Sequence, residues 1–265
     1  MDYIFVKKNN HNKYISDYQL SKLLVGNKKN IIDKDNSSYQ FFNQSISKNE
    51  LNKKINSNID IILPLDENSY TKAIELNTFD NIDKINFYIG SELIESIDGS
   101  NIEILQYIYK IDNKKIPFGI FNNGLLFGNT YHQIKINISA RNNSIYNIKF
   151  YKYVMYNDNP GAYSMKILQY SKNKLFHPIR HIVVKNKYSN LFLKFIINND
   201  IYKYCLSNEY IIGNYLIFTF NDIIDMSNCS DYFVVDDTDT KVNDVFYIYS
   251  NLLLKMSGMS GLRFN

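Results

Sequence analysis

Apolar residues alternate with polar ones along many short stretches of this chain, and this alternation constrains the fold more than any other feature. In residues 84–97 it puts Ile85, Phe87 and Ile89 on one face, and residues 133–139 repeat the pattern with three isoleucines. A period of two residues is that of a half-buried β-strand. Further runs of strand length, separated by Asn, Asp, Gly and Ser clusters, are residues 147–155, 180–185, 190–198, 200–207, 215–221 and 244–256.

The composition favours an all-β fold. The chain has 265 residues, with 23 Tyr, 17 Phe, 10 Gly and 4 Pro, and branched and aromatic side chains suit a pleated, half-buried surface. Many strands with frequent turn signals predict an antiparallel sandwich, jelly roll or barrel rather than a parallel α/β sheet.

Helical patterns are scarce. The best is residues 16–26, where Ser16 can cap the first turn, three leucines form a stripe and Gly26 can end the helix. Residues 99–111 have apolar residues at helical spacing and are compatible with a helical turn or an edge strand.

A stretch rich in turn residues divides the chain into two halves of similar size. Residues 156–164, YNDNPGAYS, contain Asn-Pro and Pro-Gly, which are strong turn dipeptides. We therefore expect an N-terminal arm with the first strands (1–57), a first sandwich (58–157), a second sandwich (158–255) and a C-terminal docking tail (256–265).

The charge pattern does not indicate a nucleic-acid partner. The formal net charge is +4, and no block of Lys and Arg marks a nuclear signal or a nucleic-acid patch. Direct binding of DNA or RNA is therefore not expected.

Neither secretion nor a membrane span is expected. The first three residues include an acid and no basic region before an apolar stretch, and no run approaches the roughly 20 apolar residues of a span. Cys205 and Cys229 are too few for a disulfide framework, which fits a reduced cytosolic setting. A soluble protein is the expectation.

The titratable clusters do not form a recognisable metal or catalytic site. His177 and His181 stand four apart, but Pro178 lies between them in a stretch that reads as a strand, which argues against a zinc helix. The acidic residues 234–244 lack the Gly and the distal Glu of a calcium loop and favour a solvated turn.

Three carboxylates in residues 90–100 are the remaining candidates for acid–base chemistry. Glu92, Glu95 and Asp98 alternate with apolar neighbours, which favours the solvent side of a strand and its turn. We expect no enzymatic activity, catalytic residue, metal or cofactor.

The last residues, 251–265, combine an apolar run with a tail of small residues. Leu and Phe gain nothing from hanging in water at a free end, so the tail is expected to dock. Gly258 and Gly261 allow a bend or a close approach, while Met259, Leu262 and Phe264 are expected to fill apolar pockets.

Three stretches resemble one known family. Residues 84–109 and 116–138 resemble the first-roll region of the double jelly-roll major capsid proteins of large nucleocytoplasmic DNA viruses. In that family an I-P-L and aromatic run precedes a Gly-Leu pair and Y-H-x-V-K-I. The matching positions are Ile116, Pro117, Phe118, Gly124, Leu125, Tyr131, His132, Ile134, Lys135 and Ile136.

The end of the chain carries the most specific match. The family commonly closes with a strand followed by M-S-G-M-x-G-L, and residues 256–262 read MSGMSGL. The structural or interface positions that the resemblance suggests are Gly90, Pro117, Gly124, Tyr131, His132, Met256, Gly258, Met259, Gly261, Leu262 and Phe264.

The resemblance implies two consecutive antiparallel jelly rolls and a structural role. It implies a homotrimer of pseudo-hexagonal outline that builds an icosahedral shell or assembly lattice, located in the virion and assembled in the host cytoplasm. The implied partners are further copies of the chain, minor or penton capsid proteins, and an underlying viral membrane.

Alternatives remain open at this point. The chain is shorter than is usual for the family and lacks its typical N-terminal pattern, so a minor capsid protein, a compact lattice protein and a relative of the poxvirus scaffold are alternative structural roles. From other classes, a jelly-roll module could bind glycans through Tyr and Asn, and a jelly-roll enzyme could hold a metal with His132, His177 and His181.

Overall fold

The computed structural model is built mainly of β-strands with a few short helices, as predicted. The chain divides into two compact units, and each unit combines two separate stretches of sequence. We call residues 35–170 with 251–265 roll 1, and residues 1–34 with 171–250 roll 2. The described residues are 13–24, 44–55, 58–63, 69–123, 126–127, 132–141, 144–155, 162–185, 188, 190–207, 209–256 and 259–263.

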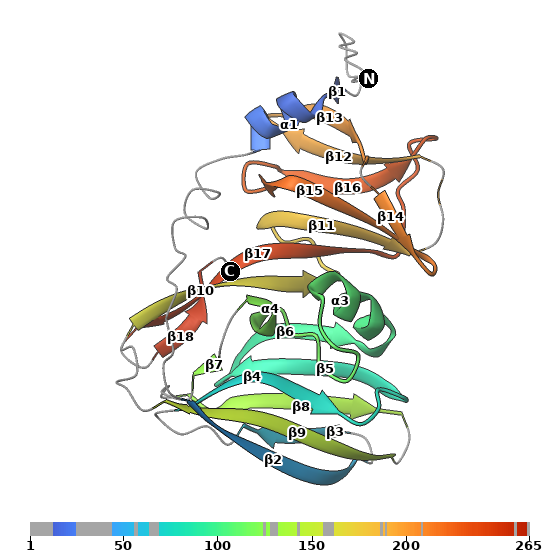
Figure 1. Ribbon diagram of the computed structural model, residues 1–265. Helices are drawn as coiled ribbons and strands as arrows, with labels where there is room; N and C mark the ends of the chain where they lie inside the picture. The colour runs from blue at the N-terminus through green and yellow to red at the C-terminus, as the bar shows by residue number, and fades with distance from the viewer. Residues whose placement is uncertain are drawn as a thin grey trace. The chain divides into compact units, whose positions relative to one another are not determined.

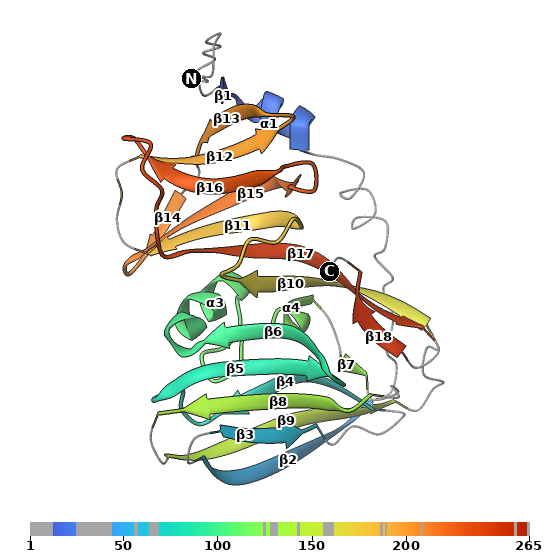
Figure 2. The ribbon, with the colours of Figure 1, turned by 180° about the vertical axis from the view of Figure 1, so that it is seen from behind.

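Roll 1 contains two four-stranded sheets, one behind the other in Figures 1 and 2. Their strand orders are β2-β9-β4-β7 and β3-β8-β5-β6. The bounds are β2 (Gln44–Ile55), β3 (Asn58–Ile62), β4 (Ser69–Leu76), β5 (Ile82–Ile89), β6 (Glu92–Asp98), β7 (Leu126–Phe127), β8 (Ile134–Ala140) and β9 (Ser144–Met155).

The other elements of roll 1 lie between or after these strands. They are the 3-10 turn η1 (Gly99–Asn101), the helices α3 (Ile102–Tyr109) and α4 (Ile120–Asn123), the strand β10 (Ala162–Ser171) up to Tyr170, the last part of β17 (Val245–Met256) and β18 (Met259–Leu262).

The inward faces of roll 1 are apolar, as the alternation predicts. Ile85 and Phe87 on β5 are fully buried and pair with Ile138 and Ile136 on β8. Phe150 on β9 is buried in the other sheet. Burying each such side chain contributes roughly 1.5–3 kcal/mol, so the pattern that predicted the strands also supplies much of the core.

Roll 2 is also built on two sheets. One is a four-stranded sheet of order β1-β13-β12-β16, and the other is the β17-β11-β15-β14 part of a six-stranded sheet that also includes β10 and β18. The bounds are β1 (Lys13–Ile15), β11 (Pro178–Lys185), β12 (Leu191–Ile197), β13 (Asp200–Cys205), β14 (Glu209–Ile212), β15 (Tyr215–Asp225) and β16 (Asp231–Asp236), and β17 belongs to roll 2 up to Ser250.

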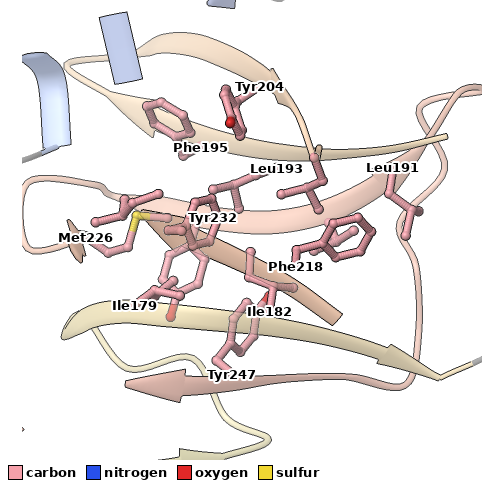
Figure 3. Packing of buried hydrophobic residues seen from close by; sticks show 14 of the residues in the cluster. Ile179, Ile182, Leu191, Leu193, Phe195, Tyr204, Phe218, Met226, Tyr232 and Tyr247 are labelled. Carbon is pink, nitrogen blue, oxygen red and sulfur yellow. The ribbon is translucent and has the colours of Figure 1, made fainter. Parts of the chain in front are cut away.

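Figure 3 shows the core between these two sheets. Leu193 and Phe195 enter it from β12, and Ile182 and Phe218 enter it from β11 and β15; all four are at most 1% exposed. Aromatic residues fill much of this core, and Tyr232 keeps its hydroxyl satisfied by donating to the Leu175 carbonyl oxygen at 2.7 Å. A Tyr-rich core is stable only where such partners exist.

The helix predicted near the N-terminus is present as α1 (Asp17–Leu24). The Gln19 N–H donates to Ser16 Oγ at 3.4 Å, and the Ser16 N–H donates to Gln19 Oε1 at 3.2 Å. This reciprocal pair is a capping box, so Ser16 begins the helix as predicted. Leu20 and Leu24 are buried in the roll 2 core, while Gly26 lies outside the described residues.

Residues 99–111 form a helix rather than an edge strand. Ile102 and Leu105 of α3 are buried, which fits their helical spacing. Lys110 has a left-handed φ of 54° and donates its backbone N–H to the carbonyl oxygens of the last turn, which ends the helix.

The units differ from the sequential division expected from the sequence. The α1 segment groups with roll 2, and residues 251–265 group with roll 1. The expected boundary between residues 157 and 158 lies outside the described residues. A turn-rich stretch shows where the chain changes direction, but strand pairing decides which segments share a core.

Gly119 provides a test of packing in roll 1. A Cβ on Gly119 would lie 1.5 Å from the Leu168 carbonyl oxygen of β10, which only backbone movement could relieve. We expect Gly119→Ala to lower the free energy of unfolding by about 3 kcal/mol or more. The matched control is Gly213→Ala, since that Cβ meets nothing within 4 Å and only the φ of +55° is strained, at about 1–2 kcal/mol. Urea titrations that gave equal losses for the two variants would contradict this packing.

Candidate functional site

A buried carboxyl group on β6 is the centre of the candidate site. Glu95 is 4% exposed, so the expectation that it lies on the solvent side of a strand is wrong. β5 and β6 keep a regular register up to the pair of Phe87 and Glu95, and the register shifts only beyond this pair, where Tyr88 pairs with Leu93. Regular alternation therefore places Glu95 inward, on the same side as buried Ile97.

Three elements donate hydrogen bonds to this carboxyl group. The Gly119 N–H, just before α4, donates to Glu95 Oε2 at 2.8 Å. The Tyr170 N–H of β10 donates to Oε1 at 3.2 Å, and the Tyr109 hydroxyl of α3 donates to Oε1 at 3.4 Å. Glu95 thereby connects β6 to a helix, a loop and a strand that are distant in the sequence.

Burial controls the ionisation of this group. Desolvation raises the pKa of Glu95 to about 8, and the hydrogen bonds from Gly119, Tyr170 and Tyr109 act in the opposite direction. Burial, followed by the charge of Glu95, holds the pKa of Tyr109 well above its usual value. At neutral pH the carboxyl group is therefore mostly protonated, and the network contains a neutral acid.

The network continues to the last part of β17. Gln169 Nε2 donates to the Ile94 carbonyl oxygen at 3.1 Å, and Asn251 Nδ2 donates to Gln169 Oε1 at 2.9 Å. Asn251 is fully buried. The Glu95 network, as we call it, consists of Glu95, Ile94, Asp98, Asn101, Tyr109, Gly119, Gln169, Tyr170 and Asn251.

The C-terminal tail folds back on β17 as a strand. β18 is antiparallel to β17, with Leu253 opposite Leu262 and Met256 opposite Met259. The Arg263 N–H donates to the Leu252 carbonyl oxygen at 2.9 Å. The tail therefore docks within its own chain, on roll 1.

Two details of the tail differ from expectation or extend it. Met259 is 61% exposed, so the expectation that it fills an apolar pocket is wrong for the single chain, because the strand pairing turns it outward. A Cβ on Gly261 would lie 3.3 Å from Glu92 Oε2 of β6, which fits the predicted close approach. Leu262 is half-buried, whereas Gly258 and Phe264 lie outside the described residues.

The remaining interface candidates lie on roll 1. Gly90 has a φ of +61° in the turn between β5 and β6, and a Cβ there would lie 3.1 Å from the ring of exposed His132. Pro117 is buried before α4. Gly124 and Tyr131 lie outside the described residues. The resemblance thus marked a turn and its neighbouring histidine, and their interface role stays a prediction.

The described histidines and acidic residues of roll 2 do not converge on a metal site. His177 is buried directly before β11, and His181 within β11 lies 3.0 Å from Thr219 Oγ1 through its Nδ1. Burial, with Arg180 nearby, lowers the pKa of His181 to about 4. Within the part of the chain that the structure describes, no group of three or more His, Cys, Asp or Glu is placed to hold a metal ion.

The acidic stretch is a turn tied by its own side chains. Asp236 Oδ1 accepts from the Thr238 and Thr240 backbone N–H groups at 3.0 and 2.9 Å. Asp239 pairs with Lys194 at 2.6 Å and with buried Lys203 at 3.2 Å. The arrangement matches the solvated turn that the sequence favoured.

The two cysteines and the described helices give no further candidate site. Cys205 and Cys229 do not form a disulfide; Cys205 is exposed and Cys229 is buried. Burial, followed by the charge of Asp225, raises the pKa of the Cys229 thiol to about 12, which leaves it unreactive. No helix in the described ranges has the length and apolar character to cross a membrane.

Glu95→Gln should change how stability depends on pH. The folded pKa of Glu95 lies above its ordinary value near 4.5, so the folded state binds more protons than the unfolded state between about pH 4.5 and 8. Stability therefore falls as pH rises through this window, by up to about 1.4 kcal/mol per pH unit. Glu95→Gln should remove this slope.

The variant should also lose stability at low pH, because one amide oxygen cannot accept both backbone N–H groups. The melting temperature of each protein between pH 4.5 and 9 tests this. Glu103→Gln, on the exposed side of α3, is the control and should follow the parent chain. If the pH dependence of the melting temperature is unchanged in Glu95→Gln, the assignment of the raised pKa to Glu95 is wrong.

No protein-family model matches the sequence, and no curated protein matches it significantly. Solved structures match in fold. VP54 of PBCV-1, from a crystal structure fitted into a cryo-EM reconstruction of the virophage Sputnik, aligns with a TM-score of 0.58 at 10% identity, over 86% of this chain and 99% of that chain.

Two further structures are similar. A quasi-atomic model of the PBCV-1 virus capsid aligns with a TM-score of 0.56 at 9% identity, over 86% of this chain and 99% of that chain. The major capsid protein P2 from Bacteriophage PM2 aligns at 0.49 and 12% identity, over 82% of this chain and 98% of that chain. The expected double jelly-roll fold of viral capsid proteins is confirmed for this chain by the PBCV-1 structures.

Proposed function

We propose that this protein is a structural subunit of a viral capsid, which trimerises into capsomers of pseudo-hexagonal outline. The observation that carries the proposal is the fold shared with PBCV-1 VP54 over 86% of the chain. A second structure of similar fold is a model of the PBCV-1 virus capsid, so this fold occurs in a viral shell. The MSGMSGL sequence at residues 256–262 supports the same role.

The two-roll architecture suits a hexagonal lattice. Two similar rolls per chain give six in a trimer, and a closed ring of three copies is a common symmetry. In this role the protein resides in the virion, assembles in the host cytoplasm, and contacts further copies, minor or penton capsid proteins and an underlying membrane. The role requires no catalysis or cofactor.

Exposed apolar side chains indicate one surface for subunit contact. Leu93 on β6 is 47% exposed and Met259 on β18 is 61% exposed. These two strands lie next to each other in roll 1. Large apolar residues exposed on neighbouring strands gain free energy when a partner covers them, so we place a subunit contact here.

Sedimentation and electron microscopy test the assembly. The purified chain should sediment as a trimer, with a buried interface well above about 1,000 Å², and negative-stain images should show pseudo-hexagonal particles. Leu93→Asp combined with Met259→Asp should shift the protein toward monomer. Ile211→Asp, an exposed apolar position on β14 of roll 2, is the matched control. A parent chain that stays monomeric over a wide concentration range contradicts the proposed function.

Removal of the tail tests its structural part separately. Deleting residues 257–265 removes β18 and leaves the end of β17 without its partner. We expect a lower melting temperature and a weaker trimer, measured by calorimetry and sedimentation. If the shortened chain melts and assembles like the parent, the tail has neither role.

A further inference from the structure

Roll 2 holds residues 13–24 in the way that a protein holds a bound peptide. β1 pairs in parallel with β13 at the edge of its sheet, with Tyr14 opposite Lys203 and Ile15 opposite Tyr204. Among the described strands, β1 alone pairs with this edge of β13. Addition of a strand to a sheet edge is a common mode of peptide recognition.

Side chains reinforce this strand addition. The Lys203 ammonium lies 5.4 Å from the centre of the Tyr14 ring and 4.4 Å from that of Phe192. The Tyr204 hydroxyl donates to the Asp17 carboxylate at the start of α1. Both contacts join the segment to the same strand, β13, so they fix its register.

The helical half of the segment, α1, packs its apolar face into the core of roll 2. Leu20 and Leu24 of α1 are 5% and 1% exposed, and they belong to the same core cluster as Leu206 and Phe220. The helix next to β15 contains its own capping box at Ser16. The segment thus supplies a strand that pairs with the sheet edge, a helix with an apolar face and the capping residues of that helix. These contacts do not involve the residues that directly follow the segment in the sequence.

The segment is joined to the rest of the chain only through a long connection. Residues 25–43 lie between α1 and β2, and a chain of that length spans at most roughly 65 Å. A roll of about 130 residues has a radius of gyration near 14 Å. The connection is therefore long enough to reach a roll 2 in an adjacent copy.

We infer that the edge of β13 and the apolar surface beside β15 form a docking site for a second copy of this chain, which inserts its own residues 13–24. Exchange of an identical element requires no new contact, because the same pairs form in either arrangement. The inference is independent of the proposed function, since it depends on roll 2 and its bound segment alone.

Cysteine cross-linking between full-length chains tests the exchange. One chain carries Tyr14→Cys and the other, with a different tag, carries Lys203→Cys; both carry Cys205→Ser, which removes the exposed thiol. Paired residues on neighbouring strands are close enough for a disulfide. Co-expression and mild oxidation should give a covalent dimer of the two tagged chains that is lost on reduction, with the disulfide identified by mass spectrometry.

Two comparisons decide what the dimer means. A chain with both cysteines that closes an internal disulfide, while the co-expressed pair stays monomeric, overturns the inference; so does the absence of any disulfide in either experiment, because the pairing of β1 with β13 is then not formed. Adding Leu24→Gln to the Tyr14→Cys chain buries a polar group and should lower the dimer yield about tenfold. Lys22→Gln, at an exposed position of the same helix, should leave the yield unchanged. Equal yields would show random collision and would also overturn the inference.

Discussion

Each roll of this protein is completed by a segment from the opposite end of the chain. Roll 2 takes residues 13–24, and roll 1 takes the residues after Ser250. Each segment is bound by contacts between residues far apart in sequence, such as the pairing of β1 with β13 and the hydrogen bond of Asn251 to Gln169. Loop closure over such distances costs entropy, which the contacts of the closing segments must offset. Neither sandwich can be cut out of the chain as a contiguous piece and keep all of its strands.

The Glu95 network explains how roll 1 accepts its closing segment. Buried N–H groups of Gly119 and Tyr170 point at one side chain, and leaving such groups without an acceptor costs about 1–3 kcal/mol each. An apolar residue at position 95 would leave both unsatisfied. A carboxyl group satisfies them, and its protonation at neutral pH removes the larger cost of burying a charge. From there, Gln169 and Asn251 carry the hydrogen bonds to β17.

The sequence predicted the parts of the fold that depend on local pattern. Alternation identified β5 and β8, and the capping residues identified α1, because strand period and helix caps are properties of neighbouring residues. The hydrogen bonds that stabilise Glu95 in its buried position come from Gly119 and Tyr170, which are distant in the sequence, so no single stretch encodes them. A signal was nevertheless present, since Glu95 and Ile97 are two residues apart and a strand places such residues on one face.

The same limit applies to the tail. Its docking was expected from the apolar residues, but its strand pairing with β17 was not, because small residues carry little strand propensity. The exposed position of Met259 follows from that pairing and not from its hydrophobicity. A role of the tail in subunit contact therefore had the least support from the sequence pattern.

The two closing segments differ in what they allow. β18 follows β17 after residues 257–258, so its partner strand is always the one that precedes it, and it moves to another copy only if β17 moves as well. β1 and α1 have no such tie, since residues 25–43 separate them from the next strand. The C-terminal segment therefore fixes the interior of one roll, whereas the N-terminal segment completes whichever roll 2 lies within its reach. A chain built in this way keeps one roll closed within each copy and leaves the other able to link neighbouring copies.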